Sequence, residues 1–495
     1  MLKYKRLTTI SACLLFISAG LSAAELSNLL STDVVVVGAG GTGVSAAAAA
    51  YQNGAKVIIL EKMPFIGGSS ALAGGAIAAG DSNAQKRANM TDTTAEGFAN
   101  IWINDQQRSY PGGDKTLPDV AKIKNISKEF TVTANRLEDT IGHKFATPRP
   151  FGYGGPNYAH APAESPIPKS GRGSSPAGGR FVIKAFQNYL TEKNIPIYTS
   201  SPVDELIVDN KGSVVGVRGR SKNGEKFEVK AKAVVLATGG FPHNEEMLKR
   251  LVPAYAKYAK VSVASVGNTG DGINMAKRIG ASEYKDAWVI GLYAGAQKKE
   301  LNATFSTKNK YKDSVFVNDE GKRFVKEDLP YLTDAIAHQK AAWAITDSTD
   351  PKKVEVLKQY NDPNIAVHGS TWQELAKAMG VSTENLVTTM TAYNEACRTG
   401  DDKLFNKPKE HLLPFLNPPY FAVRVVPQTG GTIGGIKTND KFQVLRDDNT
   451  VIKGLYAGGE VTNRPYYNRV YTSGSGLGIA YTSGRIAGTN AAKEK

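Results

Sequence analysis

The chain has 495 residues, which is too long for one compact hydrophobic core, so two or more domains are expected. Its formal net charge is +15, but Lys and Arg are scattered rather than gathered in an arm, which argues against nucleic-acid binding and favours an anionic substrate or an acidic partner protein. The sequence has no CxxCH motif and no His/Cys cluster with zinc spacing, so neither covalently attached haem nor a metal site is predicted.

The N-terminus has the pattern of a secretory signal peptide. Residues 1–6 carry three positive charges, an apolar run follows at 7–21, and small residues precede a cleavage site after Ala24. The apolar run is too short for a membrane anchor, and no other stretch is long enough to span a bilayer. We therefore predict that residues 1–24 are removed and that the mature protein is periplasmic. A generally basic exported protein is then the alternative explanation of the charge. Cleavage leaves Cys397 alone, so no internal disulfide is predicted.

The segment 32–61 has the order strand, glycine turn, helix, strand and acidic residue. A buried-strand pattern at 33–37 leads into GAGGTG, an alanine-rich helix is expected at 42–52, and a second buried strand ends at Glu61. Such glycines let the backbone approach a pyrophosphate, and the helix N-terminus points its free N–H groups at it. The acidic residue is placed to bind ribose hydroxyls. The segment predicts a dinucleotide site made of Gly38, Ala39, Gly40, Gly41, Thr42, Gly43 and Glu61.

Further glycine-rich turns favour FAD over a nicotinamide cofactor. A second glycine-rich run occupies residues 67–80, the stretch 231–241 is a strand ending in Thr238-Gly239-Gly240, and Glu460 follows another strand near the C-terminus. Glycine-rich turns from distant parts of the chain can all contact one nucleotide if that nucleotide is long and extended, as FAD is. The Pro/Gly/Ser-rich segment 145–180 is expected to be a loop over the flavin or at the substrate entrance.

Six stretches resemble the flavoprotein part of the soluble fumarate reductase and flavocytochrome c family, whose relatives include urocanate and other enoate reductases. In chain order they read EKMPFIGG, AVVLATGGF, GNTGDGINMA, DEGKRFVKE, GLYAGGEVT and SGRIAG, and they cover nearly all of residues 32–490. The resemblance implies an α/β fold in which a Rossmann-like FAD-binding domain in two segments, 25–287 and 432–495, is interrupted by an inserted α+β cap domain, 288–431. It also implies that FAD is bound non-covalently.

The resemblance extends the predicted FAD site beyond the first motif. The further cofactor-binding positions lie in the second glycine-rich run and at strand ends and helix starts: Lys62, Gly67, Gly68, Ser69, Ser70, Gly74, Gly75, Val203, Thr238, Gly239, Asp271, Glu460, Gly476 and Leu477.

Arg323 is the predicted proton donor. In the resembled family, hydride passes from flavin N5 to one carbon of a bound alkene, and an Arg at the GKRF position gives a proton to the other carbon. Arg323 follows a hairpin turn at 318–321, a place that on local grounds is more typical of a solvated surface charge. A guanidinium has a pKa of about 12 or more and is a poor acid, so the role requires a pocket that excludes water.

Several positions depart from the dicarboxylate reductases. Gly430 and Gly431 replace a His, and Ser306-Thr307 replaces Thr-Glu, which removes the usual proton relay. The predicted pocket residues are Tyr471, as a second catalytic candidate, with Arg469 as a carboxylate clamp and Tyr293, Tyr467, Ser306, Thr307 and Gly474 at the substrate. For each tyrosine, a core or surface position is the alternative. Exchange of His and Glu for Tyr favours a less charged, larger or aromatic substrate.

The sequence therefore predicts an exported FAD-dependent reductase of the carbon–carbon double bond of an α,β-unsaturated carboxylate, cinnamate-like or urocanate-like rather than fumarate. Because this chain has no haem motif, electrons would come from a separate c-type cytochrome or another exported carrier in anaerobic electron transport. Two alternatives are a FAD-dependent dehydrogenase of the ketosteroid type and a flavin electron carrier without a substrate. The hairpin Arg and the inserted cap argue against the carrier.

Overall fold

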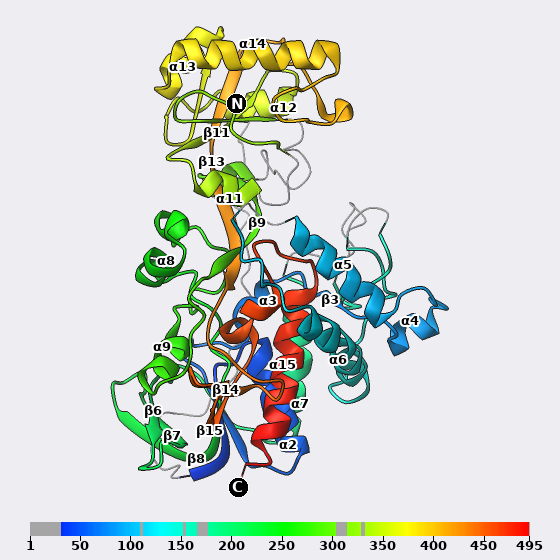
Figure 1. Ribbon diagram of the computed structural model, residues 1–495, viewed down its shortest axis with the longest axis vertical. Helices are drawn as coiled ribbons and strands as arrows, with labels where there is room; N and C mark the ends of the chain where they lie inside the picture. Colours follow the sequence, from blue (N-terminus) through cyan, green and yellow to red (C-terminus); the bar gives the residue numbers. More distant parts are fainter. Residues whose placement is uncertain are drawn as a thin grey trace, which may run out of the picture.

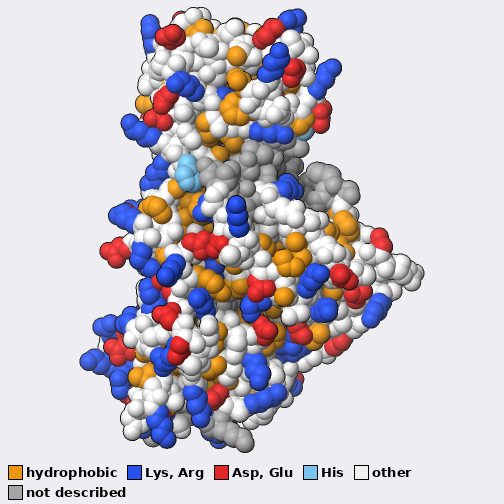
Figure 2. Space-filling view, viewed as in Figure 1, with side chains coloured by type: hydrophobic (Ala, Val, Ile, Leu, Met, Phe, Trp, Pro, Cys, Tyr) orange, Lys and Arg blue, Asp and Glu red, His pale blue; other side chains and the backbone are white. Residues whose placement is uncertain are grey.

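The computed structural model describes residues 31–108, 112–151, 155–165, 177–302, 314–327 and 332–494, in two bodies joined by long strands (Figure 1). The predicted signal peptide, Ser306, Thr307 and parts of the 145–180 loop lie outside these residues. None of the described helices combines the length and the apolar character needed to cross a lipid bilayer. Lys and Arg side chains are spread over both bodies with Asp and Glu among them on the face that Figure 2 shows.

The larger body is built on an eight-stranded sheet. Its order is β14–β15–β8–β1–β2–β5, with β7 paired to β8 and β6 paired to β7. The strands are β1 (Ser31–Val37), β2 (Val57–Leu60), β5 (Ile197–Tyr198), β6 (Val203–Val208), β7 (Val214–Arg220), β8 (Lys226–Leu236), β14 (Gln443–Leu445) and β15 (Val451–Ala457). The neighbours from β15 to β5 are parallel, so their carboxyl ends lie along one edge of the sheet. The apolar run of β1 is buried because both faces of this sheet are covered.

Two helices rich in small residues cross the middle of this body. The expected alanine-rich helix is α2 (Gly41–Gln52), and α15 (Ser475–Ala491) packs beside it. A Cβ at Gly484 would lie 2.2 Å from the carbonyl oxygen of Thr42, so the two helices approach backbone to backbone. The remaining elements are α3 (Gly68–Leu72), β3 (Ile77–Ala78), α4 (Asn83–Arg87), α5 (Ala95–Gln107), α6 (Val120–Asp139), β4 (Ala159–His160), α7 (Gly179–Glu192), α8 (Glu245–Leu251), η1 (Pro253–Tyr258), α9 (Asp271–Arg278), η5 (Gly459–Thr462) and η6 (Arg464–Tyr466).

The smaller body has its own sheet and hydrophobic core. Its strands run in the order β10–β11–β13–β12, with β9 paired to β13. They are β9 (Trp288–Ala296), β10 (Val315–Asn318), β11 (Ala342–Thr346), β12 (Ala366–Gly369) and β13 (Tyr420–Ile433). Helices α11 (Leu332–Ala337), α12 (Pro351–Leu357), α13 (Trp372–Met379) and α14 (Thr383–Thr399) pack around this sheet. The turn predicted at 318–321 closes through a hydrogen bond from the Gly321 N–H to the Asn318 carbonyl.

Strands β9 and β13 pass from one body into the other (Figure 1). Ile290 and Ile433 pack in the core of the larger body, whereas Ala294 and Val425 pack in the core of the smaller one. We keep residues 288–431 as a proposed cap domain, because its ends fall on these two crossing strands. The crossing also places β9 beside the carboxyl-end edge of the large sheet, where the candidate site lies.

Candidate active site

A cavity of about 980 Å³ lies at the junction of the two bodies. One part of its wall comes from the carboxyl ends of β1, β2 and β8 and the start of α2. The other part comes from β9, the start of α11 and the segment that leads into α15. Binding sites in open α/β sheets lie outside the carboxyl ends of the strands, and this cavity occupies that place.

The start of α2 fits a pyrophosphate. A Cβ at Gly40 would meet no atom within 4 Å, so open space lies directly in front of this residue on the cavity wall. The Gly41 N–H donates to Ser70 Oγ at 3.1 Å, which ties the second glycine-rich run to the first. Gly43 has a different task, since a Cβ there would lie 1.8 Å from the Gly38 carbonyl oxygen. The glycines therefore provide both a cradle and close helix–strand packing.

Glu61 is held rigidly at the end of β2. Its Oε2 accepts the Ala39 N–H at 2.7 Å, and its Oε1 accepts the Met63 N–H at 2.8 Å. Burial raises the pKa of Glu61, and the hydrogen bonds from Ala39 and Met63 offset part of that shift. The carboxylate lines the cavity, so its remaining lone pairs are available to a ligand. This geometry fits the expected ribose contact.

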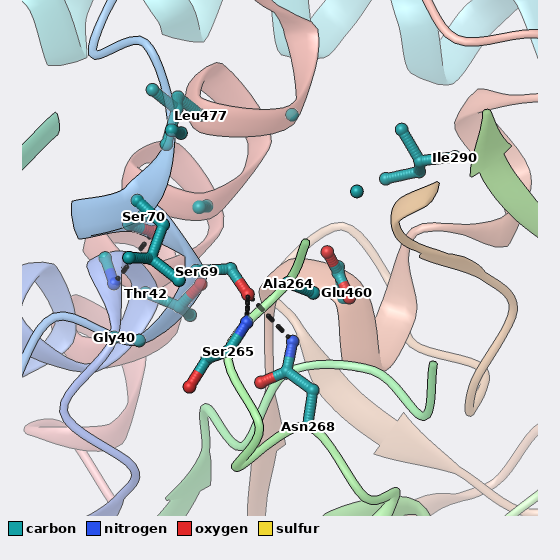
Figure 3. Close-up of a pocket in the computed structure, with 18 of the residues that line it drawn as sticks. Gly40, Thr42, Ser69, Ser70, Ala264, Ser265, Asn268, Ile290, Glu460 and Leu477 are labelled. Carbon is teal, nitrogen blue, oxygen red and sulfur yellow. Dashed lines mark hydrogen bonds between the residues drawn. The ribbon is translucent and has the colours of Figure 1, made fainter. Parts of the chain in front are cut away.

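Two polar clusters complete this end of the cavity. Lys62 Nζ lies 2.5 Å from Asp271 Oδ2 and 2.6 Å from Thr269 Oγ1. In Figure 3, Ser69 Oγ accepts the Ser265 N–H at 2.9 Å and a hydrogen bond from Asn268 at 3.1 Å. The first cluster joins the end of β2 to the start of α9, and the second joins the second glycine-rich run to the loop before α9, so these segments form one continuous part of the cavity wall.

Glu460 stands on another side of the cavity, near Ile290 (Figure 3). Its Oε2 accepts the Gly240 N–H at 3.1 Å. Burial raises the pKa of Glu460 to about 7, and hydrogen bonds from the Thr432 and Gly240 N–H groups offset part of the rise. At neutral pH this carboxyl can therefore donate as well as accept a hydrogen bond toward a bound ligand.

The cavity collects most of the predicted cofactor residues. Those on its wall are Gly38, Gly40, Gly41, Thr42, Glu61, Lys62, Gly68, Ser69, Ser70, Gly74, Gly75, Val203, Thr238, Gly239, Asp271, Glu460, Gly476 and Leu477. Ala39, Gly43 and Gly67 lie behind the wall, where the Gly67 N–H donates to the Ala39 carbonyl at 2.8 Å. Sequence reasoning missed Ser265 and Asn268, although Asn268 lies in the GNTGDG stretch that pointed to Asp271.

The wall contributed by β9 and the segment before α15 is largely apolar and aromatic. It includes Ile290, Leu292, Tyr293 and Tyr471, and Phe151 from the 145–180 segment adds a further ring to the cavity wall. Burial raises the pKa of Tyr471, and hydrogen bonds from the backbone N–H groups at the start of α15 offset part of that rise. Because the phenol oxygen accepts from the backbone, its own O–H is left to donate toward a ligand. The predicted placements of Tyr293, Tyr471 and Gly474 on the wall agree with this geometry.

The prediction that Arg323 donates a proton in the cavity is wrong, because the structure places Arg323 inside the smaller body. Its guanidinium forms two 2.7 Å hydrogen bonds with Glu327 and lies 2.8 Å from Asp402. Lys407 lies 3.4 Å from the same Glu327, and all four side chains are buried. The guanidinium also packs over the rings of Tyr393 and Phe405. Arg323 is therefore the centre of a buried ion network, and it is absent from the described cavity wall.

Two other residues predicted at the substrate lie off the described cavity wall, and their contact with a substrate stays a prediction. The Arg469 guanidinium packs on the ring of Trp288 at 4.1 Å from the ring centre, outside the described cavity wall. Tyr467 is fully buried in the core, and its hydroxyl lies 2.6 Å from Ser475 Oγ. In both cases the register of residues 466–476 could not be fixed from glycine spacing. Ser306 and Thr307 lie outside the described residues.

The glycine cradle at the start of α2, the carboxylate of Glu61 and the glycine-rich turns from distant segments lie around one cavity. Together they define a flavoprotein of the α/β dinucleotide-binding class. The family of the FAD binding domain matches residues 33–477, and the chain belongs to this family. It is 31% identical to fumarate reductase (cytochrome) of Shewanella frigidimarina over 93% of this chain and 77% of that protein. It is 30% identical to urocanate reductase of Eggerthella lenta over 93% of this chain and 74% of that protein.

A solved structure, the open conformation of a flavocytochrome c3 fumarate reductase, superposes with a TM-score of 0.70 at 30% identity, covering 94% of this chain and 78% of that chain. The 3-oxosteroid 1-dehydrogenase of Mycolicibacterium smegmatis is 27% identical over 92% of this chain and 96% of that protein. The protein is accordingly an FAD-dependent oxidoreductase that acts on carbon–carbon bonds.

Proposed function

We propose that the protein reduces the double bond of an α,β-unsaturated monocarboxylate with an aromatic or otherwise apolar body. The observation that carries this proposal is the aromatic wall opposite the nucleotide cradle, with the Tyr471 phenol at the start of α15. Bound FAD supplies the hydride in its reduced state. A fumarate-like dianion would need charged partners for both carboxylates, whereas Lys62 and Arg108 are the only Lys or Arg side chains on the described wall. Lys62 is tightly paired with Asp271 at 2.5 Å, and Arg108 lies at a longer 3.5 Å from Asp105.

Three groups of this chain have distinct tasks in the proposal. The aromatic residues Phe151 and Tyr293 exclude water and hold the apolar body of the substrate. Tyr471 donates a hydrogen bond to the substrate oxygen on which negative charge develops. Arg108, at the end of α5 and on the cavity wall, attracts the carboxylate. Electrons reach the cofactor from a separate c-type cytochrome or another exported carrier, as a periplasmic location after signal-peptide removal requires.

The experiment compares acids with their neutral esters. Holoprotein reduced with dithionite under anaerobic conditions is mixed with cinnamate, urocanate, fumarate and methyl cinnamate, and flavin absorbance reports reoxidation. We expect cinnamate or urocanate to reoxidise the flavin at least tenfold faster than fumarate. Arg108→Gln should slow the acids and spare the ester, and Arg87→Gln, a basic residue with a 60% exposed side chain that lies off the wall, serves as the control. Fumarate as the fastest oxidant would contradict the proposal.

A second candidate is dehydrogenation of a ring ketone. It is favoured by the apolar wall and by the 3-oxosteroid 1-dehydrogenase relative, whose whole length this chain nearly spans. The same flavin signal separates the two candidates, because a dehydrogenase substrate bleaches oxidised flavin whereas an enoate reoxidises reduced flavin.

A further inference from the structure

A buried carboxyl group lies next to the cavity wall where the two bodies meet. Asp334 is on α11, its side chain is nearly inaccessible to solvent, and the preceding residue, Thr333, is part of the wall. The Thr333 hydroxyl packs against Gly291 of β9, since a Cβ at that glycine would lie 2.0 Å from Thr333 Oγ1. Neither residue was singled out by sequence reasoning.

A chain of hydrogen bonds links this carboxyl group to the cavity. The Tyr255 hydroxyl, from η1 of the larger body, donates to Asp334 Oδ1, and the Trp288 indole N–H donates to the same oxygen at 2.7 Å. The Thr333 hydroxyl donates toward the Tyr255 oxygen, which offsets part of the rise in the pKa of Tyr255 and continues the chain toward the wall. Each hydroxyl can both donate and accept, so the chain can carry a proton in either direction.

The setting of Asp334 differs from that of the two buried carboxylates that pair with Arg323. Glu327 and Asp402 each lie within ion-pair distance of Arg323, whereas within the described residues Asp334 has no Lys or Arg at that distance. The nearest cation, Arg469, packs on the ring face of Trp288, and His338 of the same helix α11 stacks on that ring.

Burial raises the pKa of Asp334 to about 7, and hydrogen bonds from Tyr255 and Trp288 and the charge of Arg469 offset part of the rise. The group can therefore exist as a neutral acid near neutral pH. An ion-pair partner, as in the Arg323 network, would instead have held it as a carboxylate.

We propose that Asp334, Tyr255 and Thr333 form a relay that supplies the proton for double-bond reduction, an inference that rests on the proposed function. The β-carbon of the alkene receives a hydride, for which reduced FAD is the source, and the π electron pair moves onto the α-carbon. The α-carbon then takes the proton of Thr333, Thr333 takes that of Tyr255, and Tyr255 takes that of Asp334. The Asp334 carboxylate is left charged and regains a proton from water before the next turnover.

In this relay Thr333 is the group that touches the substrate, and Asp334 and Tyr255 act through it. Tyr471 keeps a separate task on the other part of the wall, where it stabilises charge on the substrate oxygen. The division explains how the reaction can proceed although Arg323 is held in the smaller body, away from the described wall.

The test is single-turnover reoxidation of dithionite-reduced holoprotein by cinnamate between pH 5 and pH 9. Asp334→Asn preserves an acceptor for Tyr255 and Trp288 but cannot carry a proton, so we expect a rate loss on the order of 100-fold, typical of a lost general acid. The wild-type rate should fall above pH 7, and this fall should be absent from the Asn variant. Thr333→Val should show the same loss and Thr333→Ser should restore the rate. Tyr258→Phe, on the same η1, is the control.

A readout independent of turnover is the infrared band of a neutral carboxylic acid, which should vanish as the pH rises through 7 in the wild type and be missing from Asp334→Asn. The relay alone would be overturned if the wild-type protein reduces the alkene and Asp334→Asn or Thr333→Val does so at a rate within threefold of wild type, with an unchanged pH profile. If Asp334→Asn does not fold, the comparison of Thr333→Val with Thr333→Ser tests the relay by the same rate criterion. A wild-type protein that no alkene reoxidises would overturn the proposed function and the relay together.

Discussion

Replacing Arg323 with Met should destabilise the smaller body while leaving the chemistry of the cavity intact. The substitution keeps the apolar stem but leaves Asp402 without its cation and Glu327 with Lys407 alone. Both carboxylates are buried, and removing one partner of a buried ion pair costs about 3–5 kcal/mol. At the exposed pair of Arg218 with Glu228, the same change should cost less than about 1 kcal/mol.

The assay is urea unfolding of holoprotein followed by tryptophan fluorescence, because Trp343 and Trp372 both pack in the smaller body. Arg323→Met together with Asp402→Asn should recover part of the lost stability, since the uncompensated carboxylate is gone. Turnover per bound flavin, measured well below the unfolding transition, should stay within about tenfold of wild type, a barrier change near ~1.4 kcal/mol. A variant that is as stable as wild type yet inactive would refute the structural role and indicate that Arg323 takes part in the reaction.

Three further outcomes follow from the site. Glu61→Ala should weaken FAD binding by about 1–3 kcal/mol, measured by flavin release on dilution, and unchanged release would remove Glu61 from the ribose. Tyr471→Phe should lower the rate of cinnamate reduction with little change in the affinity for cinnamate. A wild-type rate would mean that the tyrosine contributes only its ring to the cavity wall. The unfolded chain loses the Asp334 proton near the ordinary pKa of 3.8, whereas the native protein holds it up to about pH 7. Native stability therefore falls with rising pH across that window, by on the order of 4 kcal/mol. Asp334→Asn should gain stability relative to wild type between pH 5 and pH 8 in urea unfolding, and a pH-independent difference would contradict the assignment.

The nucleotide half of the site was predictable because its chemistry is carried by the backbone and by local order. Gly40, Gly41 and Glu61 lie within one strand–helix–strand unit, so their spacing along the chain fixes their positions in space. The strand-end residues Thr238 and Glu460 come from distant segments, but parallel pairing brings their strands to the same edge. For these residues, the sequence motif and the strand order both indicate a position at the same edge of the sheet.

The substrate half was not predictable to the same degree, because it depends on where side chains point after two bodies come together. Arg323 and Asp402 are far apart in sequence, and nothing local indicated that they would pair. Asp334 and Tyr255 belong to different bodies and meet only through tertiary packing. Arg469 lies two residues from Tyr471, yet only Tyr471 is on the described cavity wall, because spacing in a glycine-rich segment does not fix which side chains face the cavity.

The most direct test of the proposed function is product analysis of one turnover in heavy water. Reduced holoprotein is mixed anaerobically with cinnamate in D₂O, the flavin is monitored, and the product is identified by mass spectrometry and NMR. The proposal predicts one equivalent of the saturated acid per flavin reoxidised, with deuterium from solvent at the α-carbon. Flavin that stays reduced in the presence of every unsaturated acid, or that reoxidises without formation of a saturated product, would contradict it.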